Sequence, residues 1–270
     1  MSARILAFLL ALCLISSSDA GEGRYLDIGD SRLYFDVSGE GVPLVLLHGA
    51  LQEHGDWGEN LTAFAERYQV IALDSRGQGR SSISATELSY NLLAADVIAL
   101  LDHLAIERAH VVGLSDGANT ALLLAMTRPE RLLSIVCVGA NARADEDAVD
   151  PRMIERVRNQ DLDALAQQIK QKYIHHPNPE RLPEFLANMQ NMLLTQPNWT
   201  ADDLGHASTR TLLMGGDRDY IRQEHTLEMF RALPNASLCF VPSTGHTVPQ
   251  QNPALFMEIV VGFLEAGDDK

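Results

Sequence analysis

The stretch that decides the fold is "HVVGLSDGANTALLLAMT", residues 110–127, in which an apolar run passes through a small turn into a helical pattern. Ser115 stands between Gly113 and Gly117. The pattern Gly-x-Ser-x-Gly is common by chance, and a plain turn with a helix-capping serine has the same letters. With a strand directly before it and a helix directly after, it favours a strained turn that presents the Ser115 hydroxyl at the carboxyl edge of a sheet. Glycine is needed on both sides because a side chain there would collide with the neighbouring backbone.

Short apolar runs alternate with helical patterns along most of the chain. Continuous apolar runs suit parallel strands that are covered on both faces. The sequence therefore predicts an α/β fold: an eight-stranded, mostly parallel sheet with helices on both faces and an antiparallel pair of strands at the start. The predicted strands are 24–28, 32–37, 43–48, 69–74, 109–114, 133–139, 210–215 and 237–242, and the predicted helices are 58–67, 89–104, 116–127, 222–232 and 252–265.

Residues 141–208 break this alternation, since they contain no convincing strand and carry helical patterns at 151–160, 161–174 and 180–195. We predict a helical insertion that packs on the main domain. An insertion at the carboxyl edge of a parallel sheet also lies where ligands bind, so it can serve as a cap. The predicted organisation is a core of residues 21–140 and 209–270 with a helical cap over residues 141–208.

The first twenty residues differ from the rest. Arg4 precedes an 11-residue apolar run at 5–15, and small residues follow up to Ala20. This pattern is typical of a secretory signal peptide, residues 1–20, removed near Ala20. The run is too short to span a bilayer comfortably, so we expect a secreted or periplasmic protein with no stable membrane anchor. A lipoprotein anchor through Cys13 is an open alternative.

A serine hydroxyl becomes a nucleophile when a base takes its proton and a carboxylate orients that base. Candidates for both follow predicted strands. Asp217 and Asp219 come after the strand at 210–215, and His246 comes in a glycine-containing loop after the strand at 237–242. The chain order Ser, Asp, His and the position of each after a strand predict a catalytic triad of Ser115, His246 and one of the two aspartates.

The residues around the proposed nucleophile supply further candidates. An oxyanion hole is expected from the backbone N–H groups of Ala50, in "VLLHGAL" (45–51), and of Asp116. His48 is expected to brace that loop. The Asp116 side chain either turns away to pair with a base or cap the helix, or faces the pocket and attracts a cationic substrate group. Asp116 and Trp57 are the candidate substrate-binding residues.

The motifs "PLVLLHGA", "LDSRGQGRSS" (73–82), "VGLSDGANTALLLA", "LLMGGDRDYI" and "STGHTVPQQNP" span residues 43–253. Together they resemble the α/β-hydrolases with a helical cap, a group that includes esterases, lactonases, perhydrolases and carbon–carbon bond hydrolases. This resemblance implies that the acid is Asp219 rather than Asp217, with Asp217 as the alternative. The element "SDG" is also similar to that of biphenyl-hydrolase-like amino-acid ester hydrolases.

The resemblance implies a serine hydrolase that cleaves a small carboxylic ester or related carbonyl compound through an acyl-enzyme on Ser115. A carbon–carbon bond hydrolase, lactonase or perhydrolase with the same triad is the alternative among enzymes. A non-catalytic binding module of this fold is the alternative from another class. The intact Ser–Asp–His set counts against the binding module.

Composition narrows the other possibilities. The chain has 270 residues, 46% hydrophobic and 21% charged, and a net charge of −15. Such acidity argues against nucleic-acid binding, which needs a basic surface. The sequence shows no nucleotide or metal motif, so no cofactor or metal is expected, and the partner is a small-molecule substrate. Oligomeric state cannot be read from the sequence. Cys137 and Cys239 are predicted to lie on strands with another strand between them, too far apart for a disulfide.

Overall fold

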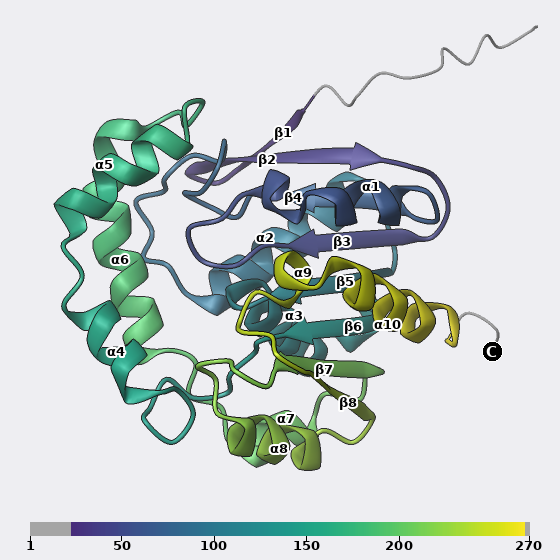
Figure 1. The fold of residues 1–270 in the computed structure, drawn as a ribbon. Coiled ribbons are helices and arrows are strands. Elements are labelled where there is room, and N and C mark those ends of the chain that lie inside the picture. The colour runs from purple at the N-terminus through teal and green to yellow at the C-terminus, as the bar shows by residue number, and fades with distance from the viewer. Residues whose placement is uncertain (1–22, 268–270) are drawn as a thin grey trace, which may run out of the picture.

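The computed structural model describes residues 23–267, and the predicted signal peptide at 1–20 lies outside the described residues. Its centre is one sheet in the order β1-β2-β4-β3-β5-β6-β7-β8 (Figure 1). The pairs β1–β2 and β2–β4 are antiparallel, and the other five are parallel. The predicted α/β class and mostly parallel eight-stranded sheet are therefore confirmed. The strands are β1 (Arg24–Ile28), β2 (Ser31–Ser38), β3 (Pro43–Leu47), β4 (Gln69–Leu73), β5 (Ala109–Leu114), β6 (Leu132–Val138), β7 (Thr211–Gly216) and β8 (Ala236–Val241).

Helices cover both faces of this sheet, which explains the continuous apolar runs. Every residue of β5 is buried. Val111 belongs to one hydrophobic cluster and Val112 to the other, because successive side chains of a strand point to opposite faces. The first cluster packs under α2 (Tyr90–His103), α3 (Asp116–Thr127) and α8 (Gln223–Ala232). The second packs under α1 (Glu59–Ala65) and α10 (Pro253–Glu265).

Local signals set the ends of several helices. The Ser89 side chain accepts a hydrogen bond from the Leu92 N–H and so caps α2. Pro253 opens α10, where the missing N–H of proline costs nothing. Shorter elements connect the main ones: α9 (Val248–Gln251) and the 3₁₀ turns η1 (His54–Trp57), η2 (Pro129–Arg131) and η3 (Pro179–Arg181).

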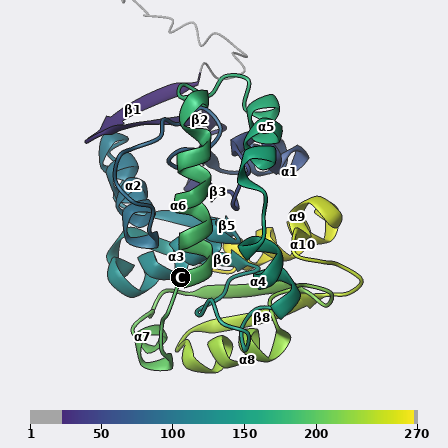
Figure 2. The ribbon, with the colours of Figure 1, turned by 90° about the vertical axis from the view of Figure 1, so that its left-hand side faces the viewer.

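The predicted insertion is helical and lies between β6 and β7. Its helices are α4 (Pro151–Arg158), α5 (Leu162–Lys172), α6 (Leu182–Thr195) and the short α7 (Ala201–Gly205). Figures 1 and 2 show α4, α5 and α6 standing across the carboxyl ends of the parallel strands. The helix α7 instead contacts α3 and α8 of the main unit. The name "cap" is used for residues 151–195, which contain α4 to α6 and the turns between them.

Several polar contacts fasten the cap to the loops at the sheet edge. The Lys172 ammonium lies 2.5 Å from an Asp56 carboxylate oxygen. The Tyr173 hydroxyl donates to the Gln52 carbonyl at 2.7 Å. On the other side, the Arg181 guanidinium donates to the Ile83 carbonyl at 3.0 Å. The cap is therefore held both at the loop after β3 and at the loop after β4.

Cys137 on β6 and Cys239 on β8 are both free. Strand β7 lies between their strands, as expected from the sequence. Among the described residues, no helix is both long and apolar enough to cross a membrane.

Candidate active site

Ser115 occupies the sharp turn between β5 and α3, which we call the elbow. Its backbone has φ 55° and ψ −116°, a conformation that costs a non-glycine residue of the order of 1–3 kcal/mol. A Cβ on Gly113 would lie 2.2 Å from the Gly117 carbonyl oxygen, and one on Gly117 would lie 2.1 Å from the Leu47 carbonyl oxygen. Both glycines are therefore required by close backbone packing, as the sequence predicts.

The structure pairs His246 with Asp219. The His246 Nδ1–H donates to the Asp219 Oδ1 over 2.8 Å, and Asp219 Oδ1 also accepts from the Ile221 N–H at 3.0 Å. The Asp217 carboxylate is turned elsewhere and accepts from the Thr244 N–H at 3.1 Å. Of the two aspartates left open by the spacing, only Asp219 contacts His246.

The second ring nitrogen of His246 points away from Asp219. This Nε2 atom is buried and has no hydrogen-bond partner among the described residues. Since Nδ1 carries the proton donated to Asp219, Nε2 is the nitrogen with a free lone pair. Ser115, His246 and Tyr220 all line the same cavity.

The loop after β3 approaches the elbow closely. A Cβ on Gly49 would lie 3.2 Å from the Ser115 Cβ, so glycine permits this approach. The Gly49 N–H donates to the Gln52 side chain at 2.9 Å, and the next N–H, that of Ala50, donates to no group among the described residues. The Asp116 N–H, at the start of α3, is likewise without an acceptor in the described part of the chain.

His48 braces this loop, as the sequence predicts. Its Nδ1–H donates to the Gly49 carbonyl at 2.8 Å, and its Nε2 accepts from the Ser75 N–H at 3.0 Å. Burial lowers the pKa of His48, so the ring stays neutral. With both nitrogens used inside the loops, His48 has no free atom for proton transfer.

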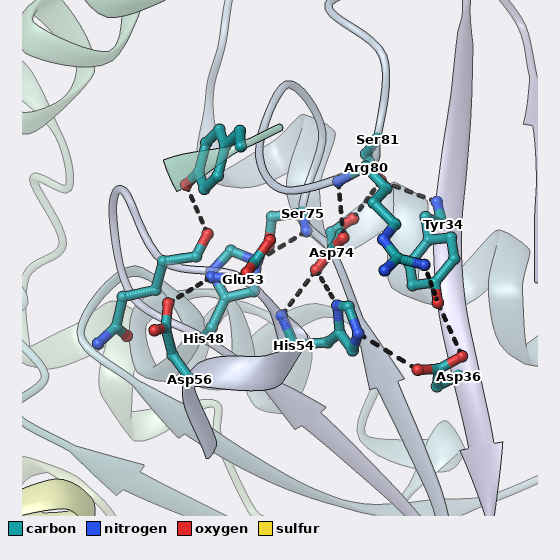
Figure 3. A network of polar contacts seen from close by, with 12 residues as sticks. Tyr34, Asp36, His48, Glu53, His54, Asp56, Asp74, Ser75, Arg80 and Ser81 are labelled. Carbon is teal, nitrogen blue, oxygen red and sulfur yellow. Dashed lines mark hydrogen bonds and ion pairs between the residues drawn. The ribbon is translucent and has the colours of Figure 1, made fainter. Parts of the chain in front are cut away.

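A polar network behind the same loop is centred on His54 (Figure 3). Its Nδ1 lies 2.8 Å from Asp74 and its Nε2 lies 3.2 Å from Asp36. Burial by itself lowers the pKa of His54, but the hydrogen bonds to the two carboxylates outweigh it and raise the pKa to about 9. His54 is therefore a fixed cation that joins β2, the end of β4 and η1.

A cavity of about 640 Å³ lies between the sheet edge and the cap. Ser115, His246, Ala50 and Asp116 lie in its wall on the sheet side. The cap supplies a largely apolar wall opposite them. The cap residues that line the cavity are Met153, Ile154, Arg156, Val157, Gln160, Leu162, Leu165, Gln168, Leu186, Met189, Gln190, Leu193 and Leu194.

Asp116 is buried in the wall of the cavity rather than turned out to solvent. Its Oδ1 accepts from the Tyr90 hydroxyl at 2.8 Å, and that hydroxyl also accepts from the Asn119 amide at 3.0 Å. Burial raises the pKa of Asp116 to about 6, although the hydrogen bond from Tyr90 opposes this. The other oxygen, Oδ2, is buried and has no partner among the described residues.

Trp57, the other candidate substrate-binding residue, is not among the described residues that line the cavity. It is 2% exposed and packs against Phe256. An aromatic residue shortly after the oxyanion loop can face either the site or the core. Here the 3₁₀ turn η1 directs it into the core cluster under α1 and α10.

Sequence reasoning missed two residues at this site. The Tyr220 ring stacks on His246, with ring centroids 4.0 Å apart. Gly139, at the end of β6, has a φ of 62°, and a Cβ there would lie 2.6 Å from the His246 Cε1. The signal for Gly139 was its place directly after a strand. Tyr220 carried no signal beyond its position next to Asp219.

The Ser115 turn and the Asp219–His246 pair lie at the carboxyl edge of a parallel sheet, under a cap. Nearby are the N–H groups of Ala50 and Asp116, which donate to no described residue. This arrangement is that of a hydrolase of the α/β type. Comparison with known sequences agrees. Residues 42–201 match the model of the alpha/beta hydrolase fold, and the chain belongs to that family. Among the described residues, no group of three or more His, Cys, Asp or Glu side chains is arranged to hold a metal ion.

Several relatives carry named activities. The chain is 27% identical over 267 residues to a 2-hydroxy-6-oxo-6-phenylhexa-2,4-dienoate hydrolase of Comamonas testosteroni, covering 88% of this chain and 93% of that one. It is 32% identical over 180 residues to the putative carbamate hydrolase RutD of Azorhizobium caulinodans, covering 67% of this chain and 61% of that protein. Among solved structures, the N-acyl homoserine lactone degrading enzyme Est816 has a TM-score of 0.72 at 26% identity, covering 89% of this chain and 100% of that chain.

Proposed function

We propose that this protein is a serine hydrolase that cleaves a small carboxylic ester or lactone through an acyl-enzyme on Ser115. The observation that carries the proposal is the buried, unpartnered Nε2 of His246 in the cavity that Ser115 lines, while Nδ1 is bound to Asp219. A base held in this way by a carboxylate is what a serine nucleophile needs.

The proposed reaction has two acyl-transfer steps. His246 Nε2 takes the Ser115 proton as the serine oxygen attacks the substrate carbonyl, and the N–H groups of Ala50 and Asp116 bind the oxyanion. His246 then gives the proton to the leaving alkoxide, which departs as an alcohol. Water, deprotonated by His246, cleaves the acyl-enzyme and restores the Ser115 hydroxyl. Asp219 keeps the His246 ring oriented and balances its positive charge while it is protonated.

Active-site labelling tests this directly. A fluorophosphonate probe reacts with an activated serine, so we expect wild-type protein to be labelled and Ser115→Ala to remain unlabelled. Turnover of p-nitrophenyl esters should fall by about 10³-fold or more in the same variant. A well-folded wild type that resists the probe and hydrolyses no ester would instead favour a non-catalytic binding module.

A carbon–carbon bond hydrolase is the second candidate. Supporting it is the near full-length similarity to the Comamonas testosteroni hydrolase, whose substrate is a 2-hydroxy-6-oxo-dienoate. Such an activity would use the same Ser115, His246 and Asp219. Measuring kcat/KM for 2-hydroxy-6-oxo-6-phenylhexa-2,4-dienoate beside that for p-nitrophenyl acetate and a simple lactone would rank the two candidates.

Asp116 is our candidate for a residue that selects the substrate. Its Oδ2 is buried in the cavity wall and has no partner within residues 23–267, so a donor group of the substrate, such as an ammonium, would satisfy it. We expect Asp116→Ala to reduce kcat/KM at least tenfold more for amino-acid esters than for neutral p-nitrophenyl esters. An equal change on both would contradict this role.

We also propose that the protein is exported, on the strength of the signal-like segment 1–20. Expression of the full chain in a bacterium, followed by intact-mass analysis of the periplasmic or medium fraction, should give a mature protein that begins near residue 21. Full-length protein confined to the cytoplasm would contradict it.

A further inference from the structure

Tyr220 stacks on His246, the base that takes the proton in the proposed reaction. Its ring stacks on His246 with centroids 4.0 Å apart and 30° between the planes. It also lines the cavity, directly after Asp219 in the chain.

His246 needs more than Asp219 to hold it in place. The hydrogen bond at Nδ1 fixes one atom of the ring and leaves the ring free to pivot about that bond. The backbone at Gly139 lies against the Cε1 and Nδ1 atoms, and the Tyr220 ring covers a face. Since Nε2 makes no hydrogen bond to the described residues, its direction depends on these packing contacts.

We propose that Tyr220 is a positioning residue whose ring holds the imidazole of His246 so that Nε2 stays directed into the cavity that Ser115 lines. This inference rests on the proposed function. No bond to Tyr220 is made or broken. The proton of the Ser115 hydroxyl passes to Nε2 as in the acyl transfer described above.

The backbone of Tyr220 links this contact to the cap. The Tyr220 carbonyl accepts from the Asp150 N–H at 2.8 Å, and the Arg222 N–H donates to the Ala148 carbonyl at 2.9 Å. Asp150 is the residue that caps the start of α4. A short antiparallel bridge therefore joins the residue that holds His246 to the segment that begins the cap.

Two substitutions separate the ring from the hydroxyl. Tyr220→Leu removes the stack, and Tyr220→Phe keeps the stack but removes the hydroxyl. We expect Leu to slow fluorophosphonate labelling and to lower kcat on a small p-nitrophenyl ester at least tenfold, with KM within twofold, because a misplaced base hinders chemistry more than binding. Phe should restore both rates to within threefold of wild type.

Phe240→Leu is the matched control. This aromatic residue lies on β8, near Gly215 at the end of β7, and does not line the cavity. This variant also loses an aromatic ring, but not one that stacks on His246. Its labelling rate should therefore stay within threefold of wild type. Thermal unfolding midpoints check that every variant is folded. If Tyr220→Leu does not fold, Tyr220→Met gives the same comparison with more of the side-chain bulk retained.

The outcomes separate this inference from the proposed function. If wild type is labelled and Tyr220→Leu is labelled equally fast, the positioning role is wrong while the hydrolase proposal stands. If Tyr220→Phe is as slow as Tyr220→Leu, the ring is not what holds His246, and the inference is again overturned. If wild type itself is not labelled, the proposed function fails first.

Discussion

Asp217 and Asp219 are two residues apart, and only the carboxylate of Asp219 meets His246. We expect Asp219→Asn to lower kcat by about 10³- to 10⁴-fold, because the amide no longer stabilises the correct tautomer and the charged form of His246. Asp217→Asn is the matched control and should lower kcat less than tenfold. Steady-state kinetics on a p-nitrophenyl ester measures both. Equal losses would show that the acid has been misassigned.

The buried Asp116 carboxyl group predicts how the free energy of unfolding changes with pH. Burial raises its pKa from an ordinary 3.8 to about 6, so the fold favours the protonated form. Below about pH 4 the group is protonated in the folded and unfolded states alike and costs nothing. As the pH rises from 4 to 6 the unfolded state loses its proton first, and folding is penalised by up to about 3 kcal/mol above pH 6.

Asp116→Asn should remove that penalty. We expect the variant to be more stable than wild type at pH 7.5 and to lose this advantage at pH 4. Urea unfolding at the two pH values measures the difference. A difference in unfolding free energy that does not change with pH would contradict the assigned cause. The expected gain fits a residue retained for substrate binding at the expense of stability.

At the scale of elements, the His54 network joins β2, β4 and η1 through one cation between two carboxylates. The pKa of His54 is about 9 in the fold and about 6.5 when unfolded, so its contribution is fully present below pH 6.5 and is lost as the pH rises to 9. Allowing for solvent screening at a site that is partly open, we expect the loss to be about 2 kcal/mol.

A comparison of wild type with His54→Gln isolates this contribution. Chemical unfolding between pH 6 and 10 should show a larger free energy of unfolding for wild type at pH 6. The two proteins should have similar free energies of unfolding by pH 10. Other groups that titrate in this range are common to both proteins and cancel in the difference. A stability gap that stays constant over the whole range would mean that the charge of His54 does not matter.

The elements were predictable from the sequence to within one or two residues at most ends, because buried parallel strands leave continuous apolar runs. The elbow was also predictable, because close contacts with neighbouring backbone atoms require glycine at 113 and 117. The direction in which an individual side chain points was not predictable. Trp57 points into the core, and the Asp116 side chain is held by Tyr90 from a different helix. Tyr220 stacks on a residue 26 positions away, which only the assembled sheet edge brings close.

For the molecule as a whole, two of the contacts that hold the cap over the cavity come from Lys172 and Tyr173. The Lys172–Asp56 pair is partly exposed and worth under about 1 kcal/mol, and the Tyr173–Gln52 hydrogen bond is worth about 1 kcal/mol. We expect the double variant Lys172→Ala, Tyr173→Phe to speed amide exchange in residues 162–181 about tenfold. Mass-spectrometric hydrogen exchange measures this, and the amides of β5 serve as the internal control. Unchanged exchange in 162–181 would mean that other contacts hold the cap.

The helix α10 runs from the site side of the molecule to the far edge of the sheet, and its last turn lies opposite the cap (Figure 1). The last turn of α10 is therefore remote from the cap, even though the helix begins only seven residues after His246. For the protein as a reagent, this makes the end of α10 the natural point of attachment. Coupled to a bead or an electrode through that end, the protein would turn its cavity and cap toward the solution, and a support there would leave the path of the substrate open.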